Sequence, residues 1–179
     1  MRTFLHLLSE AIHDGKCEAL VIGGFALEAY GFQRATQDID LLVTTRETLH
    51  MEELLKSAGY REVGRNHLCA RFSHQDPMLF PVDLLFVQDP TWDKIWTQSE
   101  PATLEGVPLR VPHPSHLVAL KLHAMHNEPQ GRKNDFGDIV RILTHRPEAL
   151  TLDELQSLCD RYTSREMFHQ FLTALRHAP

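Results

Sequence analysis

Two aspartates separated by one residue, Asp38 and Asp40, are the side chains of this sequence best suited to chemistry. They belong to the segment DIDLLV, residues 38–43, which has the apolar composition of a buried strand. Because side chains alternate along a strand, both carboxylates point to one face and repel each other unless water or a cation intervenes. Hard oxygen ligands at this spacing suit a magnesium ion that also holds substrate phosphates. The plainer alternative is a solvated strand face.

A third aspartate, Asp83, lies within the apolar run PVDLLFV. A carboxylate is costly to bury in such a run unless it is paired or binds a metal. On a strand beside Asp38 and Asp40 it would complete a three-carboxylate site. Such a site holds one or two metal ions, or deprotonates an attacking hydroxyl. The alternative is a structural aspartate that is paired or lies at the end of a loop.

Two adjacent glycines, Gly23 and Gly24, follow the apolar segment EALVI and precede a segment of helical composition. A glycine turn between a strand and a helix lets a phosphate approach the backbone and the free amides of the helix start. Taken alone, the pair indicates a turn more often than a phosphate site. Taken with the three aspartates, it indicates phosphoryl-group chemistry.

These residues need a sheet to position them, and the hydrophobic pattern predicts one. Strands are predicted at 18–22, 38–43, 60–63, 68–73, 82–87 and 107–111, and helices at 1–14, 25–30, 48–58, 93–98 (a short turn), 115–126, 134–144, 152–162 and 165–177. This order predicts an α+β fold, with a mixed sheet flanked by helices and followed by a small C-terminal helical bundle. We expect a core at 1–111 and a helical portion at 112–179 that packs on it as one compact unit.

Two helix starts carry a capping-box pattern, Thr151-x-x-Glu154 and Thr163-x-x-Glu166. In a capping box the threonine and glutamate side chains bond the free amides of the first turn. We therefore expect these residues to cap the helices predicted at 152–162 and 165–177.

Composition excludes several classes of protein. The 179 residues include 18 Lys and Arg against 24 Asp and Glu, a net charge of -6, which does not favour broad binding to nucleic acid or to a membrane surface. Three cysteines without ligand spacing argue against a disulfide framework and fit a reducing cytoplasm. The opening segment predicts an amphipathic helix, and no apolar run reaches the roughly 18 residues of a membrane span. The twelve histidines form no HExxH pattern and are interpreted as surface or capping groups.

The glycine pair, thirteen intervening residues, Asp-Ile-Asp and a later strand aspartate resemble the signature of the DNA polymerase beta-like nucleotidyltransferases. Within that superfamily, Arg34-x-Thr36-x-Asp38-Ile39-Asp40 is most similar to the AbiEii/MenT group of bacterial toxin-type enzymes. The resemblance implies that Asp38, Asp40 and Asp83 bind Mg²⁺ or Mn²⁺. It implies that Gly23, Gly24, Arg34 and Thr36 contact the nucleoside triphosphate (NTP). Arg34 would equally suit a structural pairing with Asp38 or Asp40.

The helical portion adds a second group of charged residues. Lys121 falls on the apolar side of its predicted helix, where a lysine needs an anion or must extend to solvent. The later segment resembles the family's K…RxKDxxD run, which implies that Lys121 and Lys133 bind phosphate. Asp135 and Asp138 would hold these lysines in position.

We therefore expect a cytoplasmic nucleotidyltransferase that transfers a nucleoside monophosphate from an NTP to an acceptor hydroxyl and releases pyrophosphate. A toxin-type enzyme would modify RNA, such as tRNA, or a protein, and would have an antitoxin protein as partner. One alternative is an aminoglycoside or lincosamide nucleotidyltransferase that modifies an antibiotic. Another is a non-catalytic nucleotide-binding module on the same fold.

Overall fold

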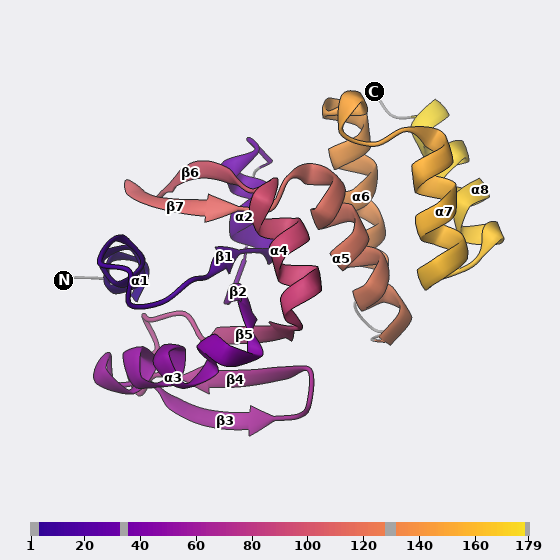
Figure 1. Cartoon of the computed structure of the whole chain (residues 1–179). Coiled ribbons are helices and arrows are strands. Elements are labelled where there is room, and N and C mark those ends of the chain that lie inside the picture. Colours follow the sequence, from indigo (N-terminus) through magenta and orange to yellow (C-terminus); the bar gives the residue numbers. More distant parts are fainter. Residues whose placement is uncertain (1–3, 33–35, 128–131, 178–179) are drawn as a thin grey trace. The chain divides into compact units, whose positions relative to one another are not determined.

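The computed structural model describes residues 4–32, 36–127 and 132–177 (Figure 1). The chain divides into two compact units, residues 1–112 and 113–179. The described strands all lie in the first unit, together with helices, and the second unit is helical. The predicted α+β class with a mixed sheet is confirmed.

The first unit contains a five-stranded sheet and a separate two-stranded hairpin. Its elements are α1 (Phe4–His13), β1 (Leu20–Val21), α2 (Gly23–Ala29), β2 (Ile39–Thr44), the 3-10 turn η1 (Thr45–Glu47), α3 (Thr48–Ser57), β3 (Arg61–Arg65), β4 (Cys69–Ser73), β5 (Val82–Val87), α4 (Asp89–Thr97), β6 (Glu100–Leu104) and β7 (Val107–Val111). The strand order is β1-β2-β5-β4-β3. Only the β2–β5 pair in this sheet is parallel.

The register of the sheet decides which side chains meet. Asp40 of β2 lies opposite Asp83 of β5, and Asp83 lies opposite Arg71 of β4. Residues opposite each other on neighbouring strands point to the same face. The register therefore places two carboxylates and one guanidinium in a row across three strands.

The core of the first unit explains why this register is fixed. Leu41, Leu42 and Val43 of β2 are fully buried, so apolar side chains cover both faces of this strand beyond Asp40. Helix α2 packs against β2. A slip of one residue would carry Asp40 into the apolar layer, which strongly disfavours the alternative register.

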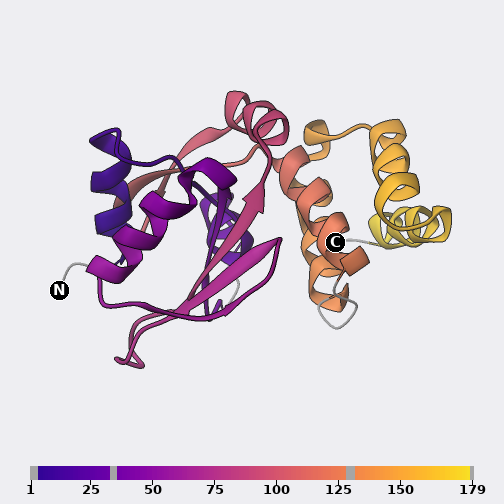
Figure 2. The same cartoon turned by 60° about the horizontal axis from the view of Figure 1, so that its bottom comes forward.

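The second unit is a small helical bundle. It comprises α5 (Pro114–Asn127), α6 (Arg132–His145), the 3-10 turn η2 (Pro147–Ala149), α7 (Leu152–Tyr162) and α8 (Arg165–Arg176). Helices α5 and α6 lie side by side, as do α7 and α8 (Figure 2). The rings of Phe136 and Phe171 stack 4.5 Å apart and join α6 to α8. No helix in the described part of the chain is long and apolar enough to cross a membrane.

Strands 82–87 and 107–111 and helix 152–162 have the predicted bounds, but other elements differ. Strand β6 was not predicted. It pairs with β7 across a turn in which Glu105 and Gly106 both adopt positive φ, 48° and 79°. Such a turn suits a tight hairpin, but Pro101 within β6 obscured the pattern of that strand. Strand β1 is shorter than predicted, α2 begins at Gly23 rather than residue 25, and α4 begins at Asp89 rather than 93.

The two predicted helix caps have different outcomes. Thr151 and Glu154 form the predicted capping box at the start of α7. The prediction for Thr163 was wrong, because Ser164 caps α8 and accepts a hydrogen bond from the Met167 amide. The Thr163 hydroxyl instead donates to the Cys159 carbonyl at the end of α7. Only Thr163 has a glutamate three residues later, but the adjacent Ser164 also carries a hydroxyl that can cap a helix, and Thr163 is used at the end of α7 instead.

Replacement of Ser164 measures how much this helix cap contributes to the free energy of unfolding. Ser164→Ala should lower the free energy of unfolding of the helical unit by about 1 kcal/mol, because the Met167 amide loses its acceptor. Thr163→Ala serves as the control and should cost less. Urea denaturation followed by circular dichroism gives both values, and a larger loss in Thr163→Ala would contradict the assigned cap.

Candidate active site

Three carboxylates from two adjacent strands form the centre of the site. Asp38 directly precedes β2, Asp40 lies within β2 and Asp83 lies within β5. One oxygen of each carboxylate lies within 4.8 Å of the others, and all three side chains are partly buried. The predicted proximity of these residues is therefore present in the structure. Three clustered carboxylates are a hard oxygen donor set of the kind that binds divalent cations.

The glycine turn between β1 and α2 lies directly against Asp40. Gly23 has a φ of +63°, and a Cβ atom at this position would lie 1.8 Å from Oδ2 of Asp40. The adjoining Ile22 amide donates a 2.9 Å hydrogen bond to the Asp40 carbonyl. Any side chain at residue 23 would displace this carboxylate, so the glycine has a steric role independent of any bound nucleotide.

Gly24 has an equivalent role toward Asp38, through Thr36. A Cβ at residue 24 would lie 2.7 Å from both Cβ and Oγ1 of Thr36. The Thr36 hydroxyl lies 3.1 Å from the Asp38 carbonyl and 3.2 Å from Oδ1 of its carboxylate, and can donate to either. Thr36 therefore helps to orient Asp38. The sequence pattern included Thr36 but did not indicate this contact.

Arg71 is the residue of the site that sequence reasoning missed. Its Nε donates a 2.8 Å hydrogen bond to Oδ1 of Asp83, and Nη2 donates to Oδ2. The hydrogen bond to Asp83 and then the charge of that carboxylate raise the pKa of the Arg71 guanidinium, to which Asp38 and Asp40 contribute further. Arg71 alternates with the buried Ala70 and Phe72, which indicates an outward-facing strand residue. Its partner depends on the β4–β5 pairing.

Lys121 lies in the second unit and forms a buried ion-pair cluster. Its Nζ donates to Oδ2 of Asp138 at 2.8 Å and to Oδ1 of Asp135 at 3.0 Å. Lys121 and Asp138 are only 8% and 3% exposed. The expectation that these aspartates hold a lysine in position fits the geometry, and phosphate binding by Lys121 stays a prediction. Arg34 and the side chain of Lys133 lie outside the described residues.

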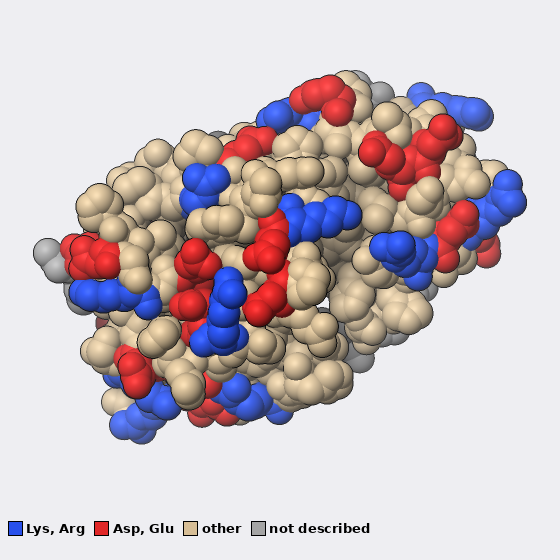
Figure 3. Space-filling model, viewed as in Figure 1, with Lys and Arg blue, Asp and Glu red and all other residues tan. Residues whose placement is uncertain are grey.

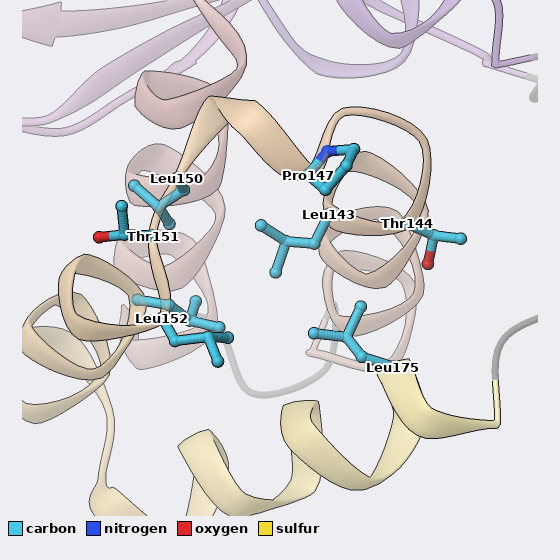
Figure 4. A pocket seen from close by; sticks show the side chains of 8 residues that line it. Leu143, Thr144, Pro147, Leu150, Thr151, Leu152 and Leu175 are labelled. Carbon is cyan, nitrogen blue, oxygen red and sulfur yellow. The ribbon is translucent and has the colours of Figure 1, made fainter.

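The helical unit also contains an apolar cavity of about 410 Å³ (Figure 4). Leucine, threonine and proline side chains from α6, η2, α7, α8 and the segment before α7 line it: Leu143, Thr144, Pro147, Leu150, Thr151, Leu152, Leu155 and Leu175. None of these eight side chains is ionisable, so the cavity offers no acid, base or metal ligand. The chemistry-bearing groups are those of the carboxylate cluster.

On the face that Figure 3 shows, acidic and basic side chains are interspersed. Ion pairs between neighbouring side chains also occur in the first unit, such as Arg46 with Glu18 and Asp89 at 3.8 and 3.7 Å. Mixed charges give a weaker field than a continuous basic surface.

Comparisons with known proteins support a common fold. A family model described as "uncharacterised nucleotidyltransferase" matches residues 3–178. No curated protein matches the sequence. The solution structure of the antibiotic-resistance factor ANT(2'')-Ia has a TM-score of 0.65 and 17% identity, and the match covers 97% of this chain and 94% of that one. A crystal structure of ANT(2'')-Ia with adenylyl-2''-tobramycin also has a TM-score of 0.65, with 16% identity and coverage of 90% and 95%.

A lincosamide adenylyltransferase is similar over a smaller part of this chain. Lincomycin-bound LnuA has a TM-score of 0.56 and 14% identity, with coverage of 78% of this chain and 94% of that one. At these identities the likenesses show the fold alone, which is the predicted nucleotidyltransferase-like fold. The narrower resemblance to the AbiEii/MenT group is not tested by these matches and stays a prediction.

The contact between Gly23 and Asp40 can be tested by adding one methyl group. Gly23→Ala should reduce the free energy of unfolding by at least about 3 kcal/mol, because the new Cβ combines an unfavourable φ with overlap of the Asp40 carboxylate. Gly15→Ala is a matched control, since Gly15 has a φ of +66° and no atom within 4 Å of its added Cβ. We expect it to cost about 1 kcal/mol. Chemical denaturation of both variants checks the difference, and equal losses would contradict a steric role specific to Gly23.

Proposed function

Because this chain belongs to the family of uncharacterised nucleotidyltransferases, we propose that it transfers a nucleoside monophosphate from an NTP to an acceptor hydroxyl. The observation that carries the proposal is the cluster of Asp38, Asp40 and Asp83, whose ligand oxygens lie within 4.8 Å of one another. In the proposed reaction the acceptor oxygen forms a bond to the α-phosphorus. The bond from that phosphorus to the oxygen shared with the β-phosphate breaks, and pyrophosphate leaves.

The residues of the cluster fit a divalent cation such as Mg²⁺ or Mn²⁺. All the donors are carboxylate oxygens, and their spacing allows one ion to contact all three side chains. We propose Asp38 and Asp40 as its principal ligands, held in place by Thr36 and by the packing of Gly23. Such an ion, when bound, neutralises developing charge on the phosphates.

Asp83 has two proposed roles, and the contacts of Arg71 bear on both. As a third ligand it would contribute one oxygen to the cation. As a general base it would accept the proton of the acceptor hydroxyl, so that the attacking oxygen gains charge as the bond to phosphorus forms. Arg71 occupies hydrogen-bonding positions on both Asp83 oxygens but leaves other lone pairs of the carboxylate available.

The remaining predicted contacts concern the triphosphate. The Gly23–Gly24 turn would bring backbone amides near the phosphates, and Arg34, Lys121 and Lys133 would offset their negative charge. Asp135 and Asp138 would fix the Lys121 ammonium, as their hydrogen bonds in the structure suggest. We expect the protein to be cytoplasmic and to use the NTPs of that compartment.

We favour a small hydroxyl-bearing molecule as the acceptor. The similar antibiotic-modifying proteins, one with an adenylylated tobramycin and one with lincomycin, match this chain over nearly their full lengths. The net charge of -6 also argues against a long nucleic acid as the acceptor. The second candidate is RNA or protein modification by a toxin-type enzyme with an antitoxin partner, which rests on the Arg34-x-Thr36-x-Asp38-Ile39-Asp40 pattern.

Removal of one carboxylate tests the reaction centre. Asp38→Asn and Asp40→Asn should each reduce nucleotidyl transfer by about a thousandfold, because each loses a charged ligand while keeping its size. Asp93→Asn, on the exposed side of α4, is the control and should transfer at the wild-type rate. The measurement is release of pyrophosphate with each of the four NTPs, Mg²⁺ and a mixture of candidate acceptors: aminoglycosides, lincosamides, total RNA and total protein. Full activity in both site variants would refute the proposed centre.

The acceptor class is identified by where the label goes. α-Labelled NTPs are incubated with the protein and, in parallel, with aminoglycosides and lincosamides, total RNA or total protein. We expect label in the small-molecule fraction, and its loss with Asp38→Asn. Label in RNA or protein would favour the toxin-type alternative. Mg²⁺-dependent NTP binding without transfer to any acceptor would indicate a non-catalytic nucleotide-binding module.

A further inference from the structure

We propose that the Arg71 guanidinium acts as a permanent counter-ion that partly neutralises the cluster of Asp38, Asp40 and Asp83. In this role it positions Asp83 and limits how tightly the cluster binds a divalent cation. The inference rests on the proposed function, because it concerns the same three carboxylates. It adds a positioning residue that the glycine and aspartate pattern of the sequence does not contain.

Arg71 fixes the orientation of the Asp83 carboxylate. Arg71 bonds both oxygens of Asp83 through two different nitrogens, one of them at 2.8 Å. A two-point contact between a planar guanidinium and a carboxylate fixes the plane as well as the position of the carboxylate. Asp83 therefore presents its remaining lone pairs in a defined direction. A lysine at residue 71 would keep the charge but lose this second point of contact.

Arg71 also offsets part of the negative charge of the cluster. Asp38, Asp40 and Asp83 together carry three negative charges within a few ångströms. Arg71 lies directly opposite Asp83, which lies directly opposite Asp40 on the next strand, so its guanidinium is adjacent to the cluster. These four side chains sum to a charge of -2, which equals in magnitude the charge of one divalent ion. Arg71 thus reduces the repulsion among the carboxylates before a metal binds, and it repels the metal when one arrives.

A second arginine on the same sheet offers a matched control. Arg65 of β3 also bonds a carboxylate through two nitrogens, with Nε at 3.2 Å and Nη2 at 2.7 Å from Glu62 oxygens. Its guanidinium lies 5.6 Å from the ring of Phe86. Because Phe86 and Asp83 are three residues apart on β5, their side chains point to opposite faces of the sheet. Arg65 therefore makes a two-nitrogen contact with a carboxylate away from the cluster, and its Nη2 also donates to Glu52.

The experiment measures Mn²⁺ binding without nucleotide, by electron paramagnetic resonance of free Mn²⁺ or by titration calorimetry. Arg71→Gln should bind Mn²⁺ about tenfold more tightly than the wild type, since one repelling charge is removed. Arg65→Gln should bind like the wild type. Arg71→Lys keeps the charge, so its affinity should stay within about threefold, whereas transfer should fall because Asp83 is no longer held at two points.

Stability without metal gives a second readout. Arg71→Gln should have a lower melting temperature than the wild type in the presence of a chelator, because the carboxylates then repel each other unopposed. Saturating Mn²⁺ should restore more stability to Arg71→Gln than to the wild type or Arg65→Gln, since tighter binding stabilises the folded state more.

The outcomes separate this inference from the proposed function. Unchanged or weaker Mn²⁺ binding in Arg71→Gln, with binding abolished in Asp38→Asn, would overturn the role of Arg71 alone. Wild-type Mn²⁺ binding in Asp38→Asn would instead overturn the metal ligands of the proposed function. Should Arg71→Gln fail to fold, Arg71→Lys still decides, because a change in its Mn²⁺ affinity of more than about threefold contradicts a role based on charge.

Discussion

Repulsion between carboxylates on adjacent strands is the constraint around which the first unit is organised. The parallel pairing of β2 with β5 sets Asp40 directly opposite Asp83, and Asp38 adds a third charge at the start of β2. Buried apolar residues on both faces of β2 hold that register against the repulsion. The sheet thus uses hydrophobic burial to maintain an arrangement of charges that is unfavourable by itself.

The neighbouring residues limit the electrostatic cost and fix the geometry. Arg71 of β4 compensates one charge through its contacts with Asp83. Gly23 leaves the space that the Asp40 carboxylate fills, and Gly24 leaves the space for Thr36, which bonds Asp38. Each aspartate therefore has its own support from a different element. A site held in this way is preorganised, so less reordering is needed when cation and triphosphate bind.

The sequence was informative where chemistry and periodicity coincide. Apolar composition predicted the strands that carry Asp40 and Asp83, and alternation predicted that Asp38 and Asp40 share a face. The cost of a carboxylate in an apolar run predicted that Asp83 is paired or binds a metal. The identity of that partner could not be predicted, because Arg71 reaches Asp83 only through the strand order β5-β4. Pro101 in β6 and the adjacent hydroxyls of Thr163 and Ser164 left local patterns ambiguous, and the folded structure resolves them. The contact from Thr36 to Asp38 depends equally on a close approach of Gly24 that no linear pattern contains.

The two edges of the five-stranded sheet have a consequence for behaviour at high concentration. An exposed edge strand offers unpaired amides and carbonyls to another chain and invites aggregation. At one edge, β1 has only two residues. At the other, β3 is exposed along its length, but it carries Arg61, Glu62 and Arg65 and its pairing is interrupted by a bulge between Glu62 and Gly64. Charge and irregular backbone at this edge disfavour the addition of a foreign strand, so the fold carries its own protection against amyloid-like association.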